Sequence, residues 1–148
     1  MTGWSYFASG FGLGYAPRAP GTLGALLGLF LGALLLHLGH AALLFGIIGL
    51  SALGVYSVSQ LQEASLDPGW VVIDEVVGQM IPLLALAHVG LRGLILSFAL
   101  FRLFDIWKPG PVGWADARHD ALGVMGDDVI AGLLALAVVL AVRLVGAI

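Results

Sequence analysis

Long apolar runs separated by short polar segments make up most of the chain. Five runs are long enough to form helices: 23–38, 41–58, 71–89, 91–106 and 129–146. A helix needs about 20 residues to cross the ~30 Å hydrocarbon layer of a bilayer, and several of these runs are shorter. The pattern predicts an all-α fold, a small polytopic membrane helix bundle with about four to five short transmembrane or re-entrant helices.

The segments between the apolar runs predict how the chain is threaded. Residues 37–40 leave room only for a tight helical hairpin, whereas 60–70 and 108–126 are polar and contain Pro and Gly, as is typical of loops. If successive runs alternate in direction, the two longer loops share one face of the membrane. We expect polar groups that border these loops to meet there.

Composition strengthens the membrane interpretation. Hydrophobic residues make up 60% of the chain, charged residues make up 10%, and the mean hydropathy is +1.05; soluble domains carry about 25% charged residues. The length of 148 residues predicts a single integral-membrane domain, 1–148. The first twenty residues lack a basic stretch followed by a continuous apolar core, so we expect no cleaved signal peptide.

Charge and cysteine content exclude several classes of function. The net charge is -3 and the chain has a single lysine, so no basic surface for nucleic acid is expected. Cysteine is absent, which excludes disulfides, thiol nucleophiles and thiolate metal ligands. If the N-terminus is cytoplasmic, four basic residues lie on the inner side (Arg18, Arg102, Lys108, Arg118) and two lie near the outer side (Arg92, Arg143), in agreement with the positive-inside rule.

Seven of the fifteen charged residues form three short clusters that border or interrupt the apolar runs. The clusters are Asp74-Glu75, then Arg102, Asp105 and Lys108, then Asp127-Asp128. Carboxylates near lipid are costly and mark candidate functional sites. The first cluster begins the third run, the second ends the fourth run, and the third begins the fifth. Alternating threading therefore brings all three to the same membrane face.

Helical spacing places further small and polar residues on shared faces. A polar and small stripe continues down one side of the third run: Asp74, Glu75, Gly78, Gln79 and Pro82. Small residues recur at helical spacing on the first and last runs: Gly24, Gly28 and Gly32, and then Asp128, Ala131, Gly132 and Ala135. Such faces allow close approach of helix backbones and also permit a homodimer.

The charges of the three clusters predict a metal site. Five carboxylates and two cations leave a formal charge of -3, and crowded carboxylates either take up protons or bind a cation. Oxygen ligands without His or Cys favour a hard ion, so we expect Mg²⁺. We assign Glu75, Asp105 and Asp128 first as ligands. Asp74 and Asp127 are assigned as further ligands or as a general base.

Basic groups beside these carboxylates predict an anion site. Arg102 offers a planar fork and Lys108 a point charge, and both fit a phosphate ester. The Gly-rich segment 10–22 leads into the first run, where free backbone amides, the Thr22 hydroxyl and Arg18 would contact phosphate oxygens. The segment lacks the ending of a nucleotide-binding loop.

Simpler interpretations of the same residues stay open at this stage. Asp127 or Asp128 would serve as a helix cap, Arg102 and Lys108 would extend toward the headgroups, and Asp74-Glu75 would mark the end of a span. A small membrane ion transporter or channel subunit is an alternative function, because buried carboxylates also line ion pathways. The concentration of charge on one side and the lack of an internal repeat favour an enzyme.

Four motifs, in order and spacing, resemble the phosphatidylglycerophosphatase A family. They are Ala19-Pro20-Gly21-Thr22, the segment 73–78 (IDEVVG), the segment 101–109 (FRLFDIWKP) followed by Pro111, and the segment 123–132 (GVMGDDVIAG). The resemblance implies a magnesium-dependent enzyme of the bacterial inner membrane, multi-pass, with its active site facing the cytoplasm. Its substrate would be phosphatidylglycerophosphate, held among membrane lipid, and its products phosphatidylglycerol and phosphate.

Overall fold

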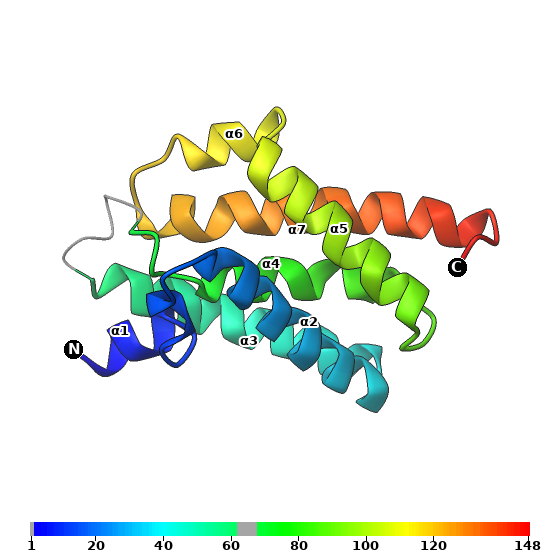
Figure 1. Ribbon diagram of the computed structural model, residues 1–148, viewed down its shortest axis with the longest axis horizontal. Helices are drawn as coiled ribbons and strands as arrows, with labels where there is room; N and C mark the ends of the chain where they lie inside the picture. Colours follow the sequence, from blue (N-terminus) through cyan, green and yellow to red (C-terminus); the bar gives the residue numbers. More distant parts are fainter. Residues whose placement is uncertain (1, 62–67) are drawn as a thin grey trace.

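A computed structural model describes residues 2–61 and 68–148, so residues 62–67 of the expected loop 60–70 lie outside the described part. Every regular element in this part is helical, as predicted (Figure 1). The elements are α1 (Gly3–Ala8), η1 (Leu13–Tyr15), α2 (Pro20–Leu38), α3 (His40–Ser59), α4 (Ile73–Met80), η3 (Ile81–Ala85), α5 (Leu91–Trp107), α6 (Pro111–Asp116) and α7 (Ala121–Leu144).

Three of the described helices are long and apolar enough to cross a membrane. They are α2 with 19 residues, α3 with 20 and α7 with 24. Helix α5 has 17 residues and is shorter than the ~20 that a full crossing needs. The arrangement is consistent with the predicted small helical membrane bundle.

The third apolar run is a broken helix at the centre of the bundle. A continuous helix over 71–89 was expected, but α4 ends at Met80 and the 3-10 helix η3 follows, with Pro82 in its first turn. Proline has no N–H to donate to the preceding turn, which explains the break. Figure 1 shows α4 in the middle of the bundle, and it packs against α2, α3, α5 and α7. Almost all residues of α4 and η3 are buried.

Glycines allow the neighbouring helices to approach this central segment. Gly24, Gly28 and Gly32 are buried on the face of α2 that meets α4, as their spacing predicted. A Cβ at Gly24 would lie 2.8 Å from Cβ of Val72, and one at Gly28 would overlap the backbone of Val76. Van der Waals contacts between closely packed backbones are one of the forces that drive helix association in lipid.

The last helix begins earlier than the sequence indicated. It starts at Ala121 rather than near Val129, and the Asp120 carboxylate caps it by accepting a hydrogen bond from the Gly123 N–H at 2.7 Å. Asp127 and Asp128 therefore lie in the second turn of α7, and the interpretation of either as its cap is wrong. The expected loop 108–126 also contains a short helix, α6, which starts at Pro111.

Candidate metal and phosphate site

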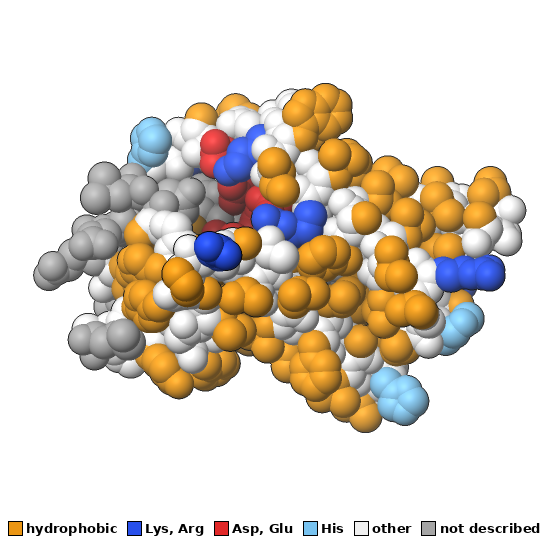
Figure 2. All heavy atoms as spheres, viewed as in Figure 1, with side chains coloured by type: hydrophobic (Ala, Val, Ile, Leu, Met, Phe, Trp, Pro, Cys, Tyr) orange, Lys and Arg blue, Asp and Glu red, His pale blue; other side chains and the backbone are white. Residues whose placement is uncertain are grey.

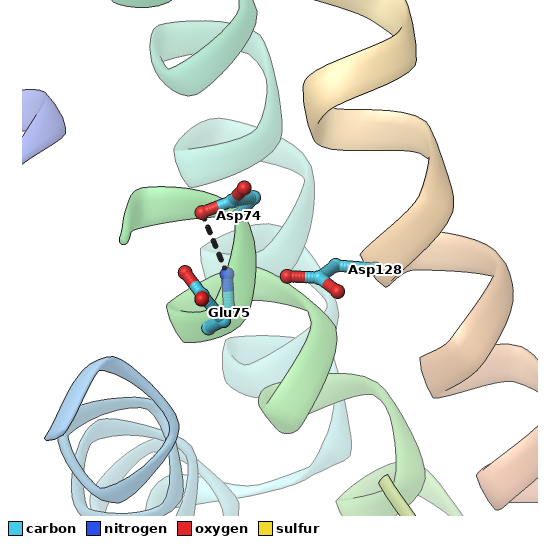
Figure 3. Close-up of side chains that lie close together, drawn as sticks. All are labelled: Asp74, Glu75 and Asp128. Carbon is cyan, nitrogen blue, oxygen red and sulfur yellow. Dashed lines mark hydrogen bonds between the residues drawn. The ribbon is translucent and has the colours of Figure 1, made fainter. Parts of the chain in front are cut away.

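Three carboxylates from two helices converge near one end of the bundle. Asp74 and Glu75 lie in the first turn of α4, and Asp128 points toward them from α7 (Figure 3). One carboxylate oxygen from each residue lies within 4.8 Å of the others. Figure 2 shows acidic side chains at the bottom of a hollow that is bordered by Lys and Arg side chains.

Close backbone packing fixes the position of these carboxylates. A Cβ at Gly78 would lie 2.6 Å from the backbone oxygen of Asp128, so α4 and α7 touch one turn below the site. A Cβ at Gly21, in the first turn of α2, would overlap the carboxylate of Glu75. A larger side chain at Gly78 would separate the two helices that carry the three acids, whereas one at Gly21 would displace the Glu75 carboxylate.

Asp74 and Asp128 are buried, Glu75 is partly buried, and none of the three is directly paired with a basic side chain of the described residues. Asp74 is 7% exposed and Asp128 is 3% exposed. No ion pair joins Asp74, Glu75 or Asp128 to a basic residue in the described part of the chain. Uncompensated buried carboxylates cost several kcal/mol each. The cluster therefore requires bound protons or a bound cation.

The donor set fits a hard divalent ion. The Oε2 atom of Glu75 is buried and has no hydrogen-bond partner among the described residues. Asp74 Oδ1 accepts a hydrogen bond from the adjacent N–H of Glu75, at 3.1 Å. Closely spaced carboxylate oxygens from three residues, one of them unpaired and with no sulfur or imidazole in the set, are the ligands that Mg²⁺ prefers. The cluster is thus able to hold a metal ion.

Arg102 and Asp105 form an ion pair beside this cluster, near the end of α5. A Cβ at Gly21 would lie 3.5 Å from Arg102 Nη1, which places the guanidinium group next to the start of α2 and to Glu75. Asp105 lies within hydrogen-bonding reach of Asp128. Asp105 was expected among the first ligands, but it belongs to this ion pair and stays outside the set of three closely spaced carboxylates.

Lys108 connects three elements at the same end of the bundle. It ends α5 in a left-handed backbone conformation, with φ of 51°. Its Nζ donates to Asp127 Oδ2 at 3.0 Å and also to Asp116. Burial lowers the pKa of Lys108, but these two hydrogen bonds raise it by more, and the net pKa is above its usual range.

Asp116 is a residue of this site that the sequence analysis did not single out. It lies at the end of α6, a helix inside the segment expected to be a loop, and it pairs with Lys108. The Gly110-Pro111 pair could have predicted the start of α6, because proline is favoured at the first position of a helix.

The remaining predicted phosphate contacts lie around the start of α2. Thr22 is in the first turn of this helix and is partly buried, whereas Arg18 is exposed just before it. The backbone N–H of Thr22 donates to the Ala19 carbonyl at 3.0 Å, so that amide is already used. No hydrogen bond or ion pair to another described residue involves the Arg18 guanidinium.

The fold and the carboxylate cluster define a small helical membrane protein whose acidic centre can hold a metal ion. Residues 6–143 match the sequence profile of phosphatidylglycerophosphatase A. The chain belongs to this family, as its four motifs predicted, and its expected class, a phosphatase, is confirmed.

Individual relatives are similar in sequence over most of the chain. The Escherichia coli protein named phosphatidylglycerophosphatase A is 34% identical, and the match covers 88% of this chain and 78% of that protein. The Haemophilus influenzae protein of the same name is 39% identical, and the match covers 92% of this chain and 86% of that protein. A Bacteroides thetaiotaomicron protein, provisionally named phosphatidylinositol-3-phosphatase, is 42% identical over 84% of each chain. No solved structure matches the chain.

Proposed function

We propose that this protein is a magnesium-dependent lipid phosphatase that hydrolyses the terminal phosphomonoester of phosphatidylglycerophosphate to phosphatidylglycerol and phosphate. The observation that carries the proposal is the convergence of Asp74, Glu75 and Asp128 beside Arg102 and Lys108, in a chain of this family. A phosphomonoester carries a charge of about -1.5 to -2. The site therefore needs both a metal and basic side chains to accept it.

Asp74, Glu75 and Asp128 would hold the metal, because their oxygens are closest together and include the unpaired Oε2 of Glu75. Asp105 and Asp127 are further candidate ligands at the edge of the set. Mg²⁺ at this position would offset phosphoryl charge and polarise the phosphoryl oxygens. Replacing any of the three central carboxylates by an amide would remove one negative charge from the metal site.

Arg102 and Lys108 would orient the phosphate. Their present partners, Asp105 for Arg102 and Asp116 with Asp127 for Lys108, hold both cations at the border of the acidic cluster. The guanidinium fork of Arg102 matches two phosphate oxygens, and the ammonium group of Lys108 contacts a third. Arg18 and Thr22 would contact the phosphate from the start of α2.

Hydrolysis needs a proton acceptor for the attacking water. We assign this role to Asp127, which lies beside Lys108 and outside the three closely spaced carboxylates. The water oxygen forms a bond to phosphorus, its proton passes to the Asp127 carboxylate, and the bond between phosphorus and the glycerol oxygen breaks. The departing glycerol oxygen then takes up a proton from solvent water, and the Asp127 carboxyl returns its proton to solvent, so that the carboxylate is restored.

The position of the site suits a lipid substrate. The cluster lies where α4 begins and α5 ends, next to the start of α2, a helix of membrane-spanning length. Acyl chains would remain in the hydrocarbon layer while the phosphorylated headgroup reaches the hollow from the side. We place this end at the cytoplasmic face of a bacterial inner membrane, on the basis of the distribution of Arg and Lys.

The alternative function, an ion transporter or channel subunit, has weaker support. A pathway needs polar groups through the whole bilayer, whereas the buried charged side chains in the described part of the chain are Asp74, Asp127 and Asp128, all near one end. The buried polar groups deeper in the bundle, such as Gln79 and Ser97, are neutral.

Phosphate release tests the proposal directly. The purified full chain in detergent should release phosphate from phosphatidylglycerophosphate in the presence of Mg²⁺ and stop when EDTA is added. Phosphatidic acid and phosphatidylinositol 3-phosphate are the comparison substrates, the latter because of the name of the Bacteroides relative. Full activity in EDTA, or a preference for either comparison substrate, would overturn the assignment.

A further inference from the structure

A second cavity, lined partly by basic residues, lies away from the acidic cluster. Its volume is about 240 Å³, and it is formed where the central segment turns back into α5, against the end of α7. Its lining includes Leu86, Arg92, Arg143 and Ile148. None of the proposed phosphatase residues lines it.

The two sites are at opposite ends of the same helices. Arg92 is near the start of α5 and Asp105 is near its end, thirteen residues or about 20 Å along the axis. Asp128 and Arg143 are separated by fifteen residues on α7, about 22 Å. Figure 2 shows Arg and His side chains at the end of the molecule away from the acidic hollow. If the acidic cluster is at one membrane face, this cavity is at the other.

The basic groups of the cavity lack acidic partners. The Arg143 guanidinium donates to the backbone oxygen of Ala85 at 2.9 Å, which fixes it over the end of η3. Arg92 is exposed and takes part in no ion pair or side-chain hydrogen bond within the described residues. No Asp or Glu lines the cavity. Two arginines therefore border one hollow without a compensating side-chain carboxylate.

We propose that this cavity binds the phosphate group of an anionic phospholipid in the leaflet opposite the acidic cluster. Guanidinium groups match phosphate oxygens in geometry and charge, and basic pockets between membrane helices are known to bind anionic headgroups. The apolar side chains of Leu86 and Ile148 suit the glycerol backbone and the start of the acyl chains. If Arg92 and Arg143 served only to reach the membrane surface with their charged groups, they would not need to line the same cavity.

Occupation of the cavity would stabilise the centre of the bundle. The cavity includes Leu86, which directly follows η3, and the Leu86 carbonyl lies 2.8 Å from His40 Nε2 at the start of α3. A headgroup held by Arg92 and Arg143 would link α5 and α7 across this turn. A ligand that binds only the folded state raises the unfolding temperature. Binding is therefore measurable as thermal stabilisation, independently of phosphatase activity.

The test is a lipid titration of the purified, delipidated full chain in a neutral detergent, followed by its thermal unfolding. Three additions are compared: phosphatidylserine, which is anionic, phosphatidylcholine, which has the same phosphodiester but no net charge, and inorganic phosphate. Phosphatidylserine should raise the unfolding temperature with saturation at a concentration at least fivefold lower than phosphatidylcholine requires. Inorganic phosphate should not reproduce the effect.

Variants assign the binding to this cavity. Arg92→Gln should raise the half-saturating phosphatidylserine concentration at least fivefold, and Arg92→Glu should abolish saturation, because Arg92 has no partner whose loss would disturb the fold. Arg118→Gln removes the same charge at the other end and should stay within twofold of wild type. Arg102→Gln, which alters the proposed catalytic site, should behave likewise.

The remaining outcomes overturn the proposal. Equal stabilisation by phosphatidylcholine would mean ordinary lipid solvation, and equal stabilisation by inorganic phosphate would mean a site for free anions. If Arg118→Gln raised the half-saturating phosphatidylserine concentration as much as Arg92→Gln, general charge attraction would be responsible for binding. If Arg102→Gln did so, the lipid would bind at the acidic end. Phosphatase activity does not enter these outcomes, so they are independent of the proposed catalytic function.

Discussion

Gly78 of α4 and Asp128 of α7 are so close that a Cβ at Gly78 would lie 2.6 Å from the backbone oxygen of Asp128. The contact joins the two helices that carry the three closely spaced carboxylates. The distance between Asp128 and the pair Asp74-Glu75 is therefore set by backbone packing rather than by flexible side chains. Such fixed spacing is what a metal site requires, because ligands must be held in place before the ion binds.

Asp128→Asn should reduce phosphate release at least about 100-fold. Loss of residues that merely support metal ligands already costs about 10–100-fold in affinity or activity, and Asp128 is proposed as a ligand. The unfolding temperature without Mg²⁺ should not fall, because the substitution relieves repulsion with Asp74 and Glu75. The measurements are a phosphate-release assay and a thermal unfolding curve. Near wild-type activity would remove Asp128 from the site.

Mg²⁺ should stabilise the wild-type protein against heat. An ion that binds only the folded state at 100 times its dissociation constant adds about 2.7 kcal/mol to the free energy of unfolding. The increase in unfolding temperature should disappear with EDTA and should be much smaller in Asp74→Asn, which lacks one charge of the cluster. Equal stabilisation of the variant and wild type would show that the ion binds elsewhere.

Gly28→Ala should destabilise the bundle by about 1–3 kcal/mol, the usual cost of overpacking. Its new methyl group would overlap the Val76 backbone at the α2–α4 contact. Gly49→Ala is the matched control, because this α3 glycine has no atom within 4 Å of its hypothetical Cβ. Helix propensity predicts that the control is neutral or stabilising by up to about 1 kcal/mol. Equal effects on the unfolding temperature of the two variants would contradict the packing described for α2 and α4.

Asp116→Asn should weaken substrate binding by several-fold without removing activity. Asp116 is a positioning residue in this proposal, since it holds the Lys108 ammonium group at the border of the site. The expected result is a raised KM with kcat changed by less than about twofold. The substitution would weaken binding of the substrate and of the transition state equally, rather than remove an interaction made only in the transition state. Asp120→Asn is the control, as it alters a nearby carboxylate that does not contact Lys108. A loss confined to kcat would rule out this role.

Asp120 should make the stability of α7 depend on pH in the acid range. Hydrogen bonds from Arg118 and from the Gly123 N–H lower the pKa of Asp120 in the folded protein. Its stabilising contribution is therefore complete above the unfolded pKa of about 3.9 and is lost as the pH falls through the lower folded pKa. The difference in unfolding temperature between wild type and Asp120→Asn should shrink between pH 5 and pH 3. A constant difference would mean that the charge of Asp120 does not stabilise the folded chain.

The apolar runs predicted the long helices well because burial in lipid imposes a strong pattern. The expected runs 41–58 and 91–106 correspond to α3 (His40–Ser59) and α5 (Leu91–Trp107) within one residue at each end. The start of α7 was missed because Asp127 and Asp128 interrupt its hydropathy. The energetic cost of placing these two carboxylates in an apolar helix is offset by a site that binds positively charged groups. This compensation comes from the tertiary structure, so a local sequence pattern does not reveal it.

The arrangement of the site was only partly predictable. Alternating helix direction was enough to bring the three charged clusters to one end. It was not enough to predict that Asp74, rather than Asp105, completes the closely spaced set with Glu75 and Asp128. That choice depends on the contact at Gly78 and on the ion pair of Asp105 with Arg102. The pairing of Lys108 with Asp116 depends on α6, whose six residues carry too weak a pattern to separate from a loop.

The shielding of α4 and η3 from lipid has a consequence for how the protein is made. A segment with two carboxylates, an amide and a proline has little tendency to enter a bilayer alone, since charged residues are the least favourable for insertion. Its neighbours α5 and α7 are synthesised after it. We therefore expect this segment to wait at the membrane surface or within the insertion machinery until the later helices arrive, so that biogenesis is completed from the C-terminal half of the chain.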